Sequence, residues 1–276
     1  MKTNSSSRRP PVSAAWLQAE LVRPGGFWRA VQVVEQTGST HDDLLSAARR
    51  GAAQGTVLVA EAQSAGRGRM GRRWVSPPRA GLTFSVLLRP AAVPAARRGW
   101  VPLLTGVAIA AALRAEAGLD AGLKWPNDVL VNEAKLAGIL AEQAGDAIVV
   151  GAGINVTVSR DELPAAETTP SGGPATSLAL EGATLTDRGQ LLAHVLAQLE
   201  HWYLAWAGAS GDAAACGLQR QYHELCQSLG REVRAQLPGG QTLTGVARAV
   251  DDTGQLLIQT GSGLVPVSAG DLVHLR

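Results

Sequence analysis

The sequence predicts an α+β fold in its larger part, followed by a small β module. Between residues 31 and 229, strand and helix patterns alternate too irregularly for a doubly wound sheet. Two hairpin turns there favour an antiparallel-rich sheet with helices on one face. From Arg231 onward, short strand patterns are separated by Pro-Gly-Gly, Asp-Thr-Gly and Gly-Ser-Gly turns. We therefore expect a flexible tail at 1–30, one domain at 31–229 and a second at 230–276.

The elements of the larger part follow from local patterns of apolar, β-branched and turn residues. A short helix is expected at 14–21 and a strand at 31–36. Thr40, with Asp43 three residues on, is expected to cap a helix that Gly51 closes. The further strands are expected at 56–62, 81–88, 122–125, 128–131, 135–143 and 147–155, and the further helices at 95–118, 185–206 and 211–229.

Turn residues divide the rest of the chain. Asn132-Glu133 and Gly145-Asp146 are good hairpin turns, so the strands on either side of each should pair. Residues 158–182 are rich in Pro, Gly, Thr and Ser and should form a loop. In the C-terminal module the expected strands are short and closely spaced, at 233–237, 243–250, 255–260 and 263–267.

The composition indicates a folded protein without a large nucleic-acid-binding surface. Hydrophobic residues make up 46% and charged residues 17% of the 276 residues, and the net charge is +2. Cys216 and Cys226 match no metal-ligand spacing or disulfide framework, which favours a reducing compartment. There is no signal-like apolar segment near the start, and the longest apolar stretch, residues 100–113, is too short for a bilayer. We therefore expect a cytoplasmic protein without membrane contacts.

Residues 66–74, the Arg/Gly loop, read Gly-Arg-Gly-Arg-Met-Gly-Arg-Arg-Trp and form the most informative segment. Glycines disfavour both helix and strand, and clustered arginines repel one another unless an anion neutralises them. Guanidinium groups match the oxygens of carboxylates and phosphates, so the segment predicts a flexible loop that orders around a small anion. From these residues alone, a solvated loop or a segment that touches nucleic acid is the alternative.

Lysine is rare in this chain, which makes its positions informative. Of the 25 basic residues, only Lys2, Lys124 and Lys135 are lysines. Arginine supplies the other positive charge, so Lys124 and Lys135 indicate places where a compact ammonium group is required. The alternative is that Lys124 and Lys135 are lysines by chance.

Four segments begin or end expected strands, so they should meet at one edge of a sheet. They are residues 63–74, 124–128, 135–140 and 151–155. Together they offer a Gly-x-Gly turn for an anion, four cations and one acid: Arg67, Arg69, Lys124, Lys135 and Asp128. The sequence shows no Ser-His-Asp set and no metal-ligand cluster, which argues against hydrolysis. The set suits the joining of a carboxylate to a nucleotide phosphate, because positive charge must offset the repulsion between two anions.

These segments resemble, in order and spacing, the signature blocks of biotin protein ligases. The blocks are Gly66-Arg67-Gly68-Arg69-Met70-Gly71-Arg72-Arg73-Trp74, Lys124-Trp125-Pro126-Asn127-Asp128, Lys135-Leu136-Ala137-Gly138-Ile139-Leu140 and Gly151-Ala152-Gly153-Ile154-Asn155. Ser39-Thr40 before a helix and the C-terminal β module match as well, so the resemblance covers residues 31–276. It implies a catalytic domain like the core of class II aminoacyl-tRNA synthetases, followed by an SH3-like domain.

The resemblance also implies an activity. Members of the family condense biotin with ATP to biotinyl-5′-adenylate with the help of magnesium, and pyrophosphate leaves. They then transfer biotin to one lysine of an acceptor, such as the biotin carboxyl carrier domain of acetyl-CoA carboxylase. We therefore expect biotin and ATP as substrates, Mg²⁺ as the metal ion and a biotin carboxyl carrier domain as the partner.

Similarity to the family assigns catalytic roles to four residues. Lys135 should face the biotin carboxylate and the α-phosphate and offset their repulsion. Arg67 and Arg69 should belong to a loop that closes over the ligands and keeps water out. Asp128 should orient or deprotonate the acceptor lysine, with a structural ion pair to Lys124 as the alternative.

A larger set should contact biotin or its adenylate. Hydroxyl and amide side chains supply the hydrogen bonds that the ureido ring needs, and Trp125 should pack beside the apolar part of biotin. The expected residues are Ser39, Thr40, His41, Gln63, Gly66, Arg67, Gly68, Arg69, Trp125, Lys135, Gly138, Gly151, Gly153 and Asn155. Arg72 and Arg248 should contact the nucleotide, and Asn127 should assist the metal ion.

Two regions depart from the family pattern. Residues 1–30 are too few for the helix-turn-helix domain of repressor-type members, so direct DNA binding is not expected. For the same reason, removal of residues 1–28 should spare activity. Residues 157–182 contain no aromatic residue, although well-studied relatives stack adenine on an aromatic in this loop. Pro174 lies near that place, and the group that packs on adenine is left open.

Two other functions compete with this interpretation. A lipoate–protein ligase on the same fold would carry an Arg-Arg…Gly-Gly-Gly block with a following His, which is absent here. A nucleic-acid-binding protein would use the Arg/Gly loop with Trp74 as a stacking surface, but the low net charge argues against it. Sheet-edge dimers are common in the family, so a homodimer is compatible with the sequence.

Overall fold

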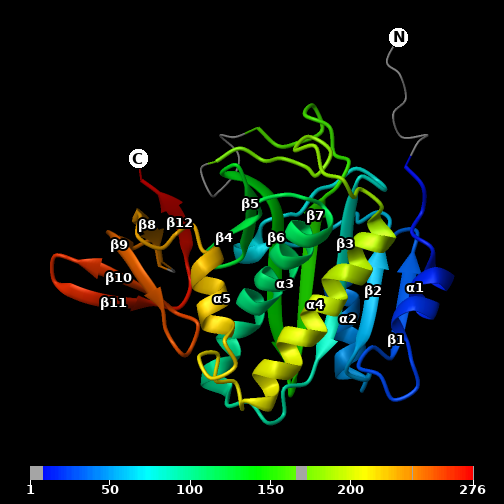
Figure 1. The fold of residues 1–276 in the computed structure, drawn as a ribbon, viewed down its shortest axis with the longest axis horizontal. Coiled ribbons are helices and arrows are strands. Elements are labelled where there is room, and N and C mark those ends of the chain that lie inside the picture. The colour runs from blue at the N-terminus through cyan, green and yellow to red at the C-terminus, as the bar shows by residue number, and fades with distance from the viewer. Residues whose placement is uncertain (1–8, 166–172, 238, 276) are drawn as a thin grey trace.

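A seven-stranded mixed sheet with helices and a separate five-stranded antiparallel sheet make up the computed structural model, which describes residues 9–165, 173–237 and 239–275 (Figure 1). The predicted α+β class and the C-terminal β module are therefore confirmed. The helices are α1 (Ala14–Leu21), α2 (Thr40–Arg49), α3 (Trp100–Glu116), α4 (Arg188–Gly208) and α5 (Leu218–Leu225), with 3₁₀ segments η2 (Arg69–Gly71) and η3 (Ala95–Gly99).

The large sheet has the strand order β1-β2-β3-β7-β6-β5-β4. Its strands are β1 (Ala30–Val34), β2 (Thr56–Ala60), β3 (Gly81–Leu88), β4 (Gly122–Lys124), β5 (Asp128–Val131), β6 (Ala134–Ala144) and β7 (Ala147–Asn155). The β1–β2 pair is parallel and the other pairs are antiparallel. The β5–β6 and β6–β7 hairpins were predicted from their turns. Asn132 and Glu133 have φ values of 48° and 62°, which are the two left-handed residues that a tight two-residue hairpin turn requires.

The small sheet has the order β11-β10-β9-β8-β12. Its strands are β8 (Glu232–Gln236), β9 (Thr242–Val250), β10 (Leu256–Thr260), β11 (Gly263–Val267) and β12 (Asp271–His274). The sequence did not indicate β12, because four residues of mixed polarity after Gly270 carry no clear alternation. Figure 1 shows this sheet beside the β4 end of the large sheet and α1 beside the β1 end.

Successive residues of β3 and β7 point to opposite faces of the large sheet and pack with different helices. Val86 and Val150 belong to the main core, which includes α3 and α4; both helices lie in front of the sheet in Figure 1. Leu87 and Val149 pack with Leu44 of α2 in a separate cluster. The expectation that all helices cover one face is therefore wrong for α2.

Several element ends differ from prediction for local reasons. The 95–118 segment is a 3₁₀ turn followed by α3, and the 211–229 segment contributes only α5, because Gly217 takes the left-handed φ of 80° before it. Ser39, not Thr40, caps α2: its Oγ accepts the amide hydrogen of Asp42 at 3.4 Å. Thr40 is the first helical residue, which frees its hydroxyl for other contacts.

The tail expected at 1–30 is wrong for its described part, residues 9–30. Leu17 of α1 and Trp28 are almost fully buried in the main core, so removal of residues 1–28 would take two large side chains out of it. Residues 1–8 lie outside the described chain. The segment is also held by a buried ion pair, because Arg188 lies 2.6 Å from Glu61 and also donates to the carbonyl oxygen of Pro10.

The C-terminal sheet is docked on the large domain by specific contacts. Trp125 Nε1 donates to Gly254 O at 3.2 Å, and Trp100 Nε1 donates to Asp251 O at 3.1 Å. Arg231 pairs with Glu133 at 2.7 Å. These contacts hold the small sheet against the large domain. Within the described residues, no helix has the length and apolar character needed to cross a membrane.

The Glu61→Gln variant should lose about 3 kcal/mol of the free energy of unfolding, because Arg188 would keep a buried charge without its counter-ion. Urea unfolding followed by circular dichroism measures this loss. The matched control is Glu35→Gln, which removes a carboxylate from the exposed pair with Arg79 and should cost less than about 1 kcal/mol. Equal losses in the two variants would contradict the importance of the buried pair.

Candidate functional site

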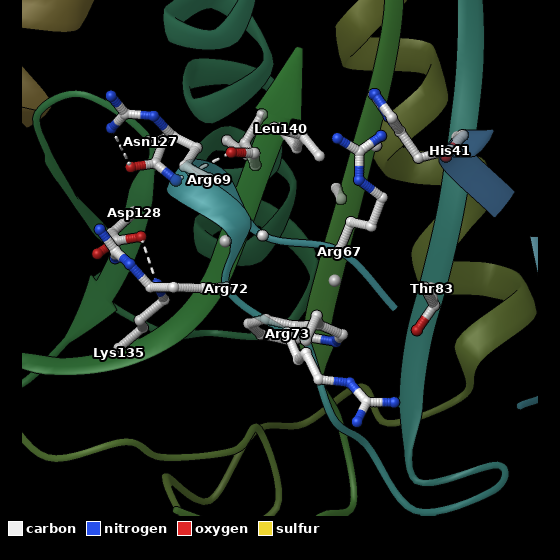
Figure 2. Close-up of a pocket in the computed structure, with 18 of the residues that line it drawn as sticks. His41, Arg67, Arg69, Arg72, Arg73, Thr83, Asn127, Asp128, Lys135 and Leu140 are labelled. Atoms are coloured by element: carbon white, nitrogen blue, oxygen red, sulfur yellow. Dashed lines mark hydrogen bonds and ion pairs between the residues drawn. The ribbon is translucent and has the colours of Figure 1, made fainter. Parts of the chain in front are cut away.

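A cavity of about 900 Å³, part of it open to solvent, lies on the face of the large sheet that also carries α2 (Figure 2). Its size falls in the range of small-molecule sites. Most of the residues that the sequence predicted for a ligand site line it: Ser39, Thr40, His41, Gln63, Arg67, Gly68, Arg69, Arg72, Trp125, Asp128, Lys135, Gly138, Gly151 and Gly153.

Three predicted residues do not line the cavity. Gly66 shapes the neck of the Arg/Gly loop, where its carbonyl accepts the amide hydrogen of Trp74 at 2.9 Å. Asn155 ends β7 and donates from Nδ2 to Thr176 O. Arg248 is exposed on β9. Arg248, which was expected to contact the nucleotide, lies outside the residues that line this cavity.

Other lining residues were not predicted as site residues. They include Arg73, Trp74, Thr83, Phe84, Ser85, Pro126, Ile139, Leu140, Ala152, Asp271 and Leu272. Thr83 and Ser85 could have been found, because they alternate with apolar residues in β3 and so must face the other side of the sheet. No local signal pointed to Asp271, which reaches the cavity from the other domain.

One end of the cavity is built from uncharged hydrogen-bonding groups at the start of α2. Thr40 Oγ1 lies 2.9 Å from Ser85 Oγ, and both side chains are buried. Gln63 Oε1 accepts the amide hydrogen of Thr40 at 2.8 Å, which orients the side-chain amide. Ser39 is buried beside them. This end suits a small neutral ligand group with several donors and acceptors.

His41 forms part of the same wall. Burial lowers the pKa of His41, although Glu142, whose Oε2 lies 3.4 Å from Nε2, acts in the opposite direction. The imidazole is therefore neutral near pH 7. Gly151 leaves room for it, because a Cβ at this position would lie 3.0 Å from His41 Nδ1.

The glycines of the 138 and 151–153 region form a flat floor. Gly138 and Gly153 are cross-strand partners in β6 and β7, and the indole of Trp74 lies against both. A Cβ at Gly153 would come within 2.3 Å of Trp74 Cε2. The predicted Gly-x-Gly turn for an anion is therefore wrong: these glycines are strand residues that allow a ring to lie on the backbone.

The other end of the cavity is charged, and Figure 2 shows Lys135 and Asp128 there, away from His41 and Thr83. Lys135 Nζ lies 2.6 Å from Asp128 Oδ1. Lys124 is buried close by, and this burial lowers the pKa of Lys124, while Asp128 acts in the opposite direction. Asp271 also lines the cavity, so Asp128 is not its single acid, as the sequence suggested.

The arginines of the loop differ in their partners. Arg67 is half-exposed and pairs with Asp42 at 2.5 Å and Glu142 at 2.7 Å. Arg69 donates to two neutral oxygens, Asn127 Oδ1 at 3.1 Å and Gly270 O at 3.3 Å. Burial lowers the pKa of Arg69, which still leaves a guanidinium charged at any physiological pH.

Arg72, the next arginine along the loop, pairs with Asp271. The described residues contain no group of three or more His, Cys, Asp and Glu side chains that could hold a metal ion. Asn127, which was expected to assist a metal, has its side-chain oxygen engaged by Arg69. Chemically, the cavity joins a neutral hydrogen-bonding end to a cationic end that contains a carboxylate, and this arrangement suits an elongated ligand with an acidic terminus.

Comparison with known proteins extends these observations. Residues 33–159 match the sequence model of the Biotin/lipoate A/B protein ligase family, and residues 228–275 match that of the Biotin protein ligase C terminal domain. The two matched segments contain the Arg/Gly loop, Lys124, Lys135 and Asp271.

Individual relatives agree over most of the chain. The Biotin–[acetyl-CoA-carboxylase] ligase of Mycobacterium tuberculosis is 42% identical over 99% of this chain and 100% of that protein. The Bifunctional ligase/repressor BirA of Bacillus spizizenii is 31% identical over 87% of this chain and 71% of that protein. The structure of the Aquifex aeolicus biotin protein ligase in complex with biotin and ATP superposes with a TM-score of 0.74 at 30% identity, covering 90% of this chain and 100% of that chain. This chain belongs to the biotin protein ligase family.

Proposed function

We propose that this protein is an ATP-dependent biotin protein ligase. It would condense biotin with ATP to biotinyl-5′-adenylate and transfer the biotinyl group to a lysine of a biotin carboxyl carrier domain. The observation that carries the proposal is the cavity with two unlike ends, a buried hydroxyl and amide end at α2 and the Lys135–Asp128 end at β5 and β6. The relative with biotin and ATP bound supports the choice of substrates.

The ureido ring of biotin occupies the neutral end in this proposal. The ring needs an acceptor for two N–H groups and donors for one carbonyl, and the network of Thr40, Ser85 and Gln63 supplies both kinds of group. Ser39 adds a hydroxyl donor. The valerate chain then extends over the strands toward Lys135, so that its carboxylate reaches the cationic end.

The first step joins two anions. A carboxylate oxygen of biotin attacks the α-phosphorus of Mg²⁺–ATP, the new P–O bond forms, and pyrophosphate leaves with its electron pair. Magnesium would enter with the nucleotide and would supply positive charge that offsets the charge of the phosphates. Lys135 offsets the repulsion between carboxylate and phosphate, and Arg69 supplies a second positive group at the same end.

The second step uses the acceptor lysine. Its neutral amine attacks the carbonyl carbon of the mixed anhydride, the amide bond forms, and AMP leaves as the C–O bond breaks. Asp128 accepts the proton from the amine once the adenylate has drawn Lys135 away from it. This role is compatible with its present ion pair, since the same carboxylate can serve both partners in turn.

Trp74 is the proposed platform for adenine. The loop at 157–182 carries no aromatic residue, whereas Trp74 lines the cavity on a glycine floor close to Lys135. Stacking of a base on an aromatic ring contributes about 1–3 kcal/mol. The sequence left open which group packs on adenine, and we propose Trp74 for this role.

We place the protein in the cytoplasm, where Cys216 and Cys226 remain free thiols, and propose a biotin carboxyl carrier domain of acetyl-CoA carboxylase as its acceptor. The name of the Mycobacterium tuberculosis relative supports that acceptor. A homodimer through a sheet edge belongs to the same proposal, and β1 is an edge strand of the large sheet.

Isothermal calorimetry should show saturable binding of biotin and no binding of lipoate, because the ureido ring matches the buried hydroxyl and amide groups and a dithiolane ring does not. A second titration with ATP after biotin should then release the heat of adenylate formation. Tighter binding of lipoate than of biotin would replace this proposal by the lipoate-ligase alternative.

Two substitutions should separate the two steps. Lys135→Ala should slow pyrophosphate release from biotin and ATP by about 10²–10³-fold, because a positive group at the forming anhydride is lost. Asp128→Asn should slow transfer from preformed adenylate by about 10²-fold or more, with a smaller effect on pyrophosphate release. Arg49→Ala, an exposed change at the end of α2, is the control. A wild-type rate for Lys135→Ala refutes its assignment.

The Trp74→Ala variant should raise the KM for ATP by about tenfold with little change in the dissociation constant of biotin, because it removes the stacking surface for adenine. Trp74→Phe should restore most of the affinity. Trp16→Ala, which changes an exposed tryptophan of α1, should behave as wild type. An unchanged KM in Trp74→Ala would place adenine elsewhere.

A further inference from the structure

The Arg/Gly loop is a narrow arch whose tip depends on contacts outside the loop. Its two sides are joined by hydrogen bonds from Trp74 N to Gly66 O at 2.9 Å and from Gly68 N to Arg72 O at 2.8 Å. A bridge pairs Arg67 with Arg73. The tip at Arg69–Gly71 lies beyond these bonds, so its position is set by the side chains that leave it.

The two parts of the loop are held by different domains. Near the neck, Arg67 pairs with Asp42 and Glu142 of the large domain. At the tip, Arg72 pairs with Asp271 of the C-terminal sheet. Arg69 also donates to Gly270 O, directly before Asp271. The tip is therefore fastened to the second domain by two consecutive residues.

The backbone of the tip needs such support. Met70 has a φ of 54° although it is not glycine, and Gly71 follows with a φ of 74°. The Met70 side chain is 58% exposed and does not hold the tip in place by burial. A disfavoured conformation persists where the surroundings determine it. Here the determining contacts are those of Arg69 and Arg72, which flank Met70 and Gly71 on both sides.

Asp271 is well placed to act as a fixed anchor. It is the first residue of β12 and pairs in register with Gln236 of β8. Gly270 packs close to that strand, because a Cβ there would lie 2.7 Å from Gln236 O. At the other end of β12, His274 Nε2 lies 2.9 Å from Ser228 Oγ, which also accepts the amide hydrogen of Trp125 of the large domain at 3.3 Å.

We propose that Asp271 is a positioning residue: through its ion pair with Arg72, the C-terminal domain holds the tip of the Arg/Gly loop closed over the cavity and so determines how long the activated intermediate is retained. The proposal rests on the proposed function for the intermediate and on geometry alone for the loop. The small sheet thus affects the reaction by holding the loop closed, although it does not contact the reacting atoms.

The test compares Asp271→Asn with a variant that breaks another contact between the same two domains. Glu133→Gln removes the partner of Arg231, 2.7 Å away, and does not involve the loop. Asp271→Glu keeps the charge and should restore the wild-type behaviour. Thermal unfolding of each variant shows that the fold is kept.

Limited trypsin digestion of the protein alone reports on the loop, because trypsin cleaves after the arginines at 67, 69, 72 and 73. Asp271→Asn should be cleaved there about tenfold faster than wild type, since a charge-assisted contact at the tip is lost. Glu133→Gln and Asp271→Glu should be cleaved at the wild-type rate. The proposal would be overturned if trypsin cleaved the loop of Asp271→Asn at the wild-type rate. It would also be overturned if trypsin cleaved Glu133→Gln as fast as Asp271→Asn.

Retention is measured with radiolabelled biotin and ATP, by following release of the labelled adenylate from the protein after rapid gel filtration. Asp271→Asn should release it about tenfold faster, with a smaller change in the rate of pyrophosphate formation in a single turnover. Unchanged release would overturn the role in retention. A wild-type protein that forms no adenylate would overturn the proposed function instead, and the trypsin assay would still decide the loop contact.

Discussion

The alternation of side chains along β3, β6 and β7 is the constraint on which the rest of the structure depends. One set of positions is apolar and packs with α3 and α4, and the other set contains Thr83, Ser85, Gly138 and Gly153. A shift of one residue in any of these strands would bury hydroxyl groups in the core and expose valines to the cavity. The same register that forms the core therefore also places small and hydroxyl-bearing residues on the face that lines the ligand site.

Three of the cations that line the cavity, Lys135, Arg67 and Arg72, are paired with carboxylates of the protein. Lys135 forms an ion pair with Asp128, and Arg72 forms one with Asp271. Arg67 pairs with two carboxylates. An entering anion must compete with these carboxylates, which favours a ligand that is also held at its neutral end. These ion pairs lower the net positive charge that the arginine-rich loop presents to a polyanion.

The sequence predicted the elements that depend on local pattern and missed those that depend on register or on distant contacts. Strands at 81–88, 128–131 and 147–155 were correct to the residue, because alternation and turn residues are local signals. The signature blocks indicated Lys135 and Gly153, but the floor that Gly153 forms requires its pairing with Gly138. Asp271 could not be found, because β12 is short and its role arises from contact with a loop about two hundred residues earlier in the chain.

The order in which the cavity is assembled follows from the placement of β12. The neutral end comes from α2 and β3, the charged end from β5 and β6, and the last lining residues, Asp271 and Leu272, from the final strand. A nascent chain therefore lacks part of the wall after the Arg/Gly loop, Lys124 and Lys135 have been made, until β12 follows them. A chain truncated before β12 would therefore carry most of the signature blocks without a complete site.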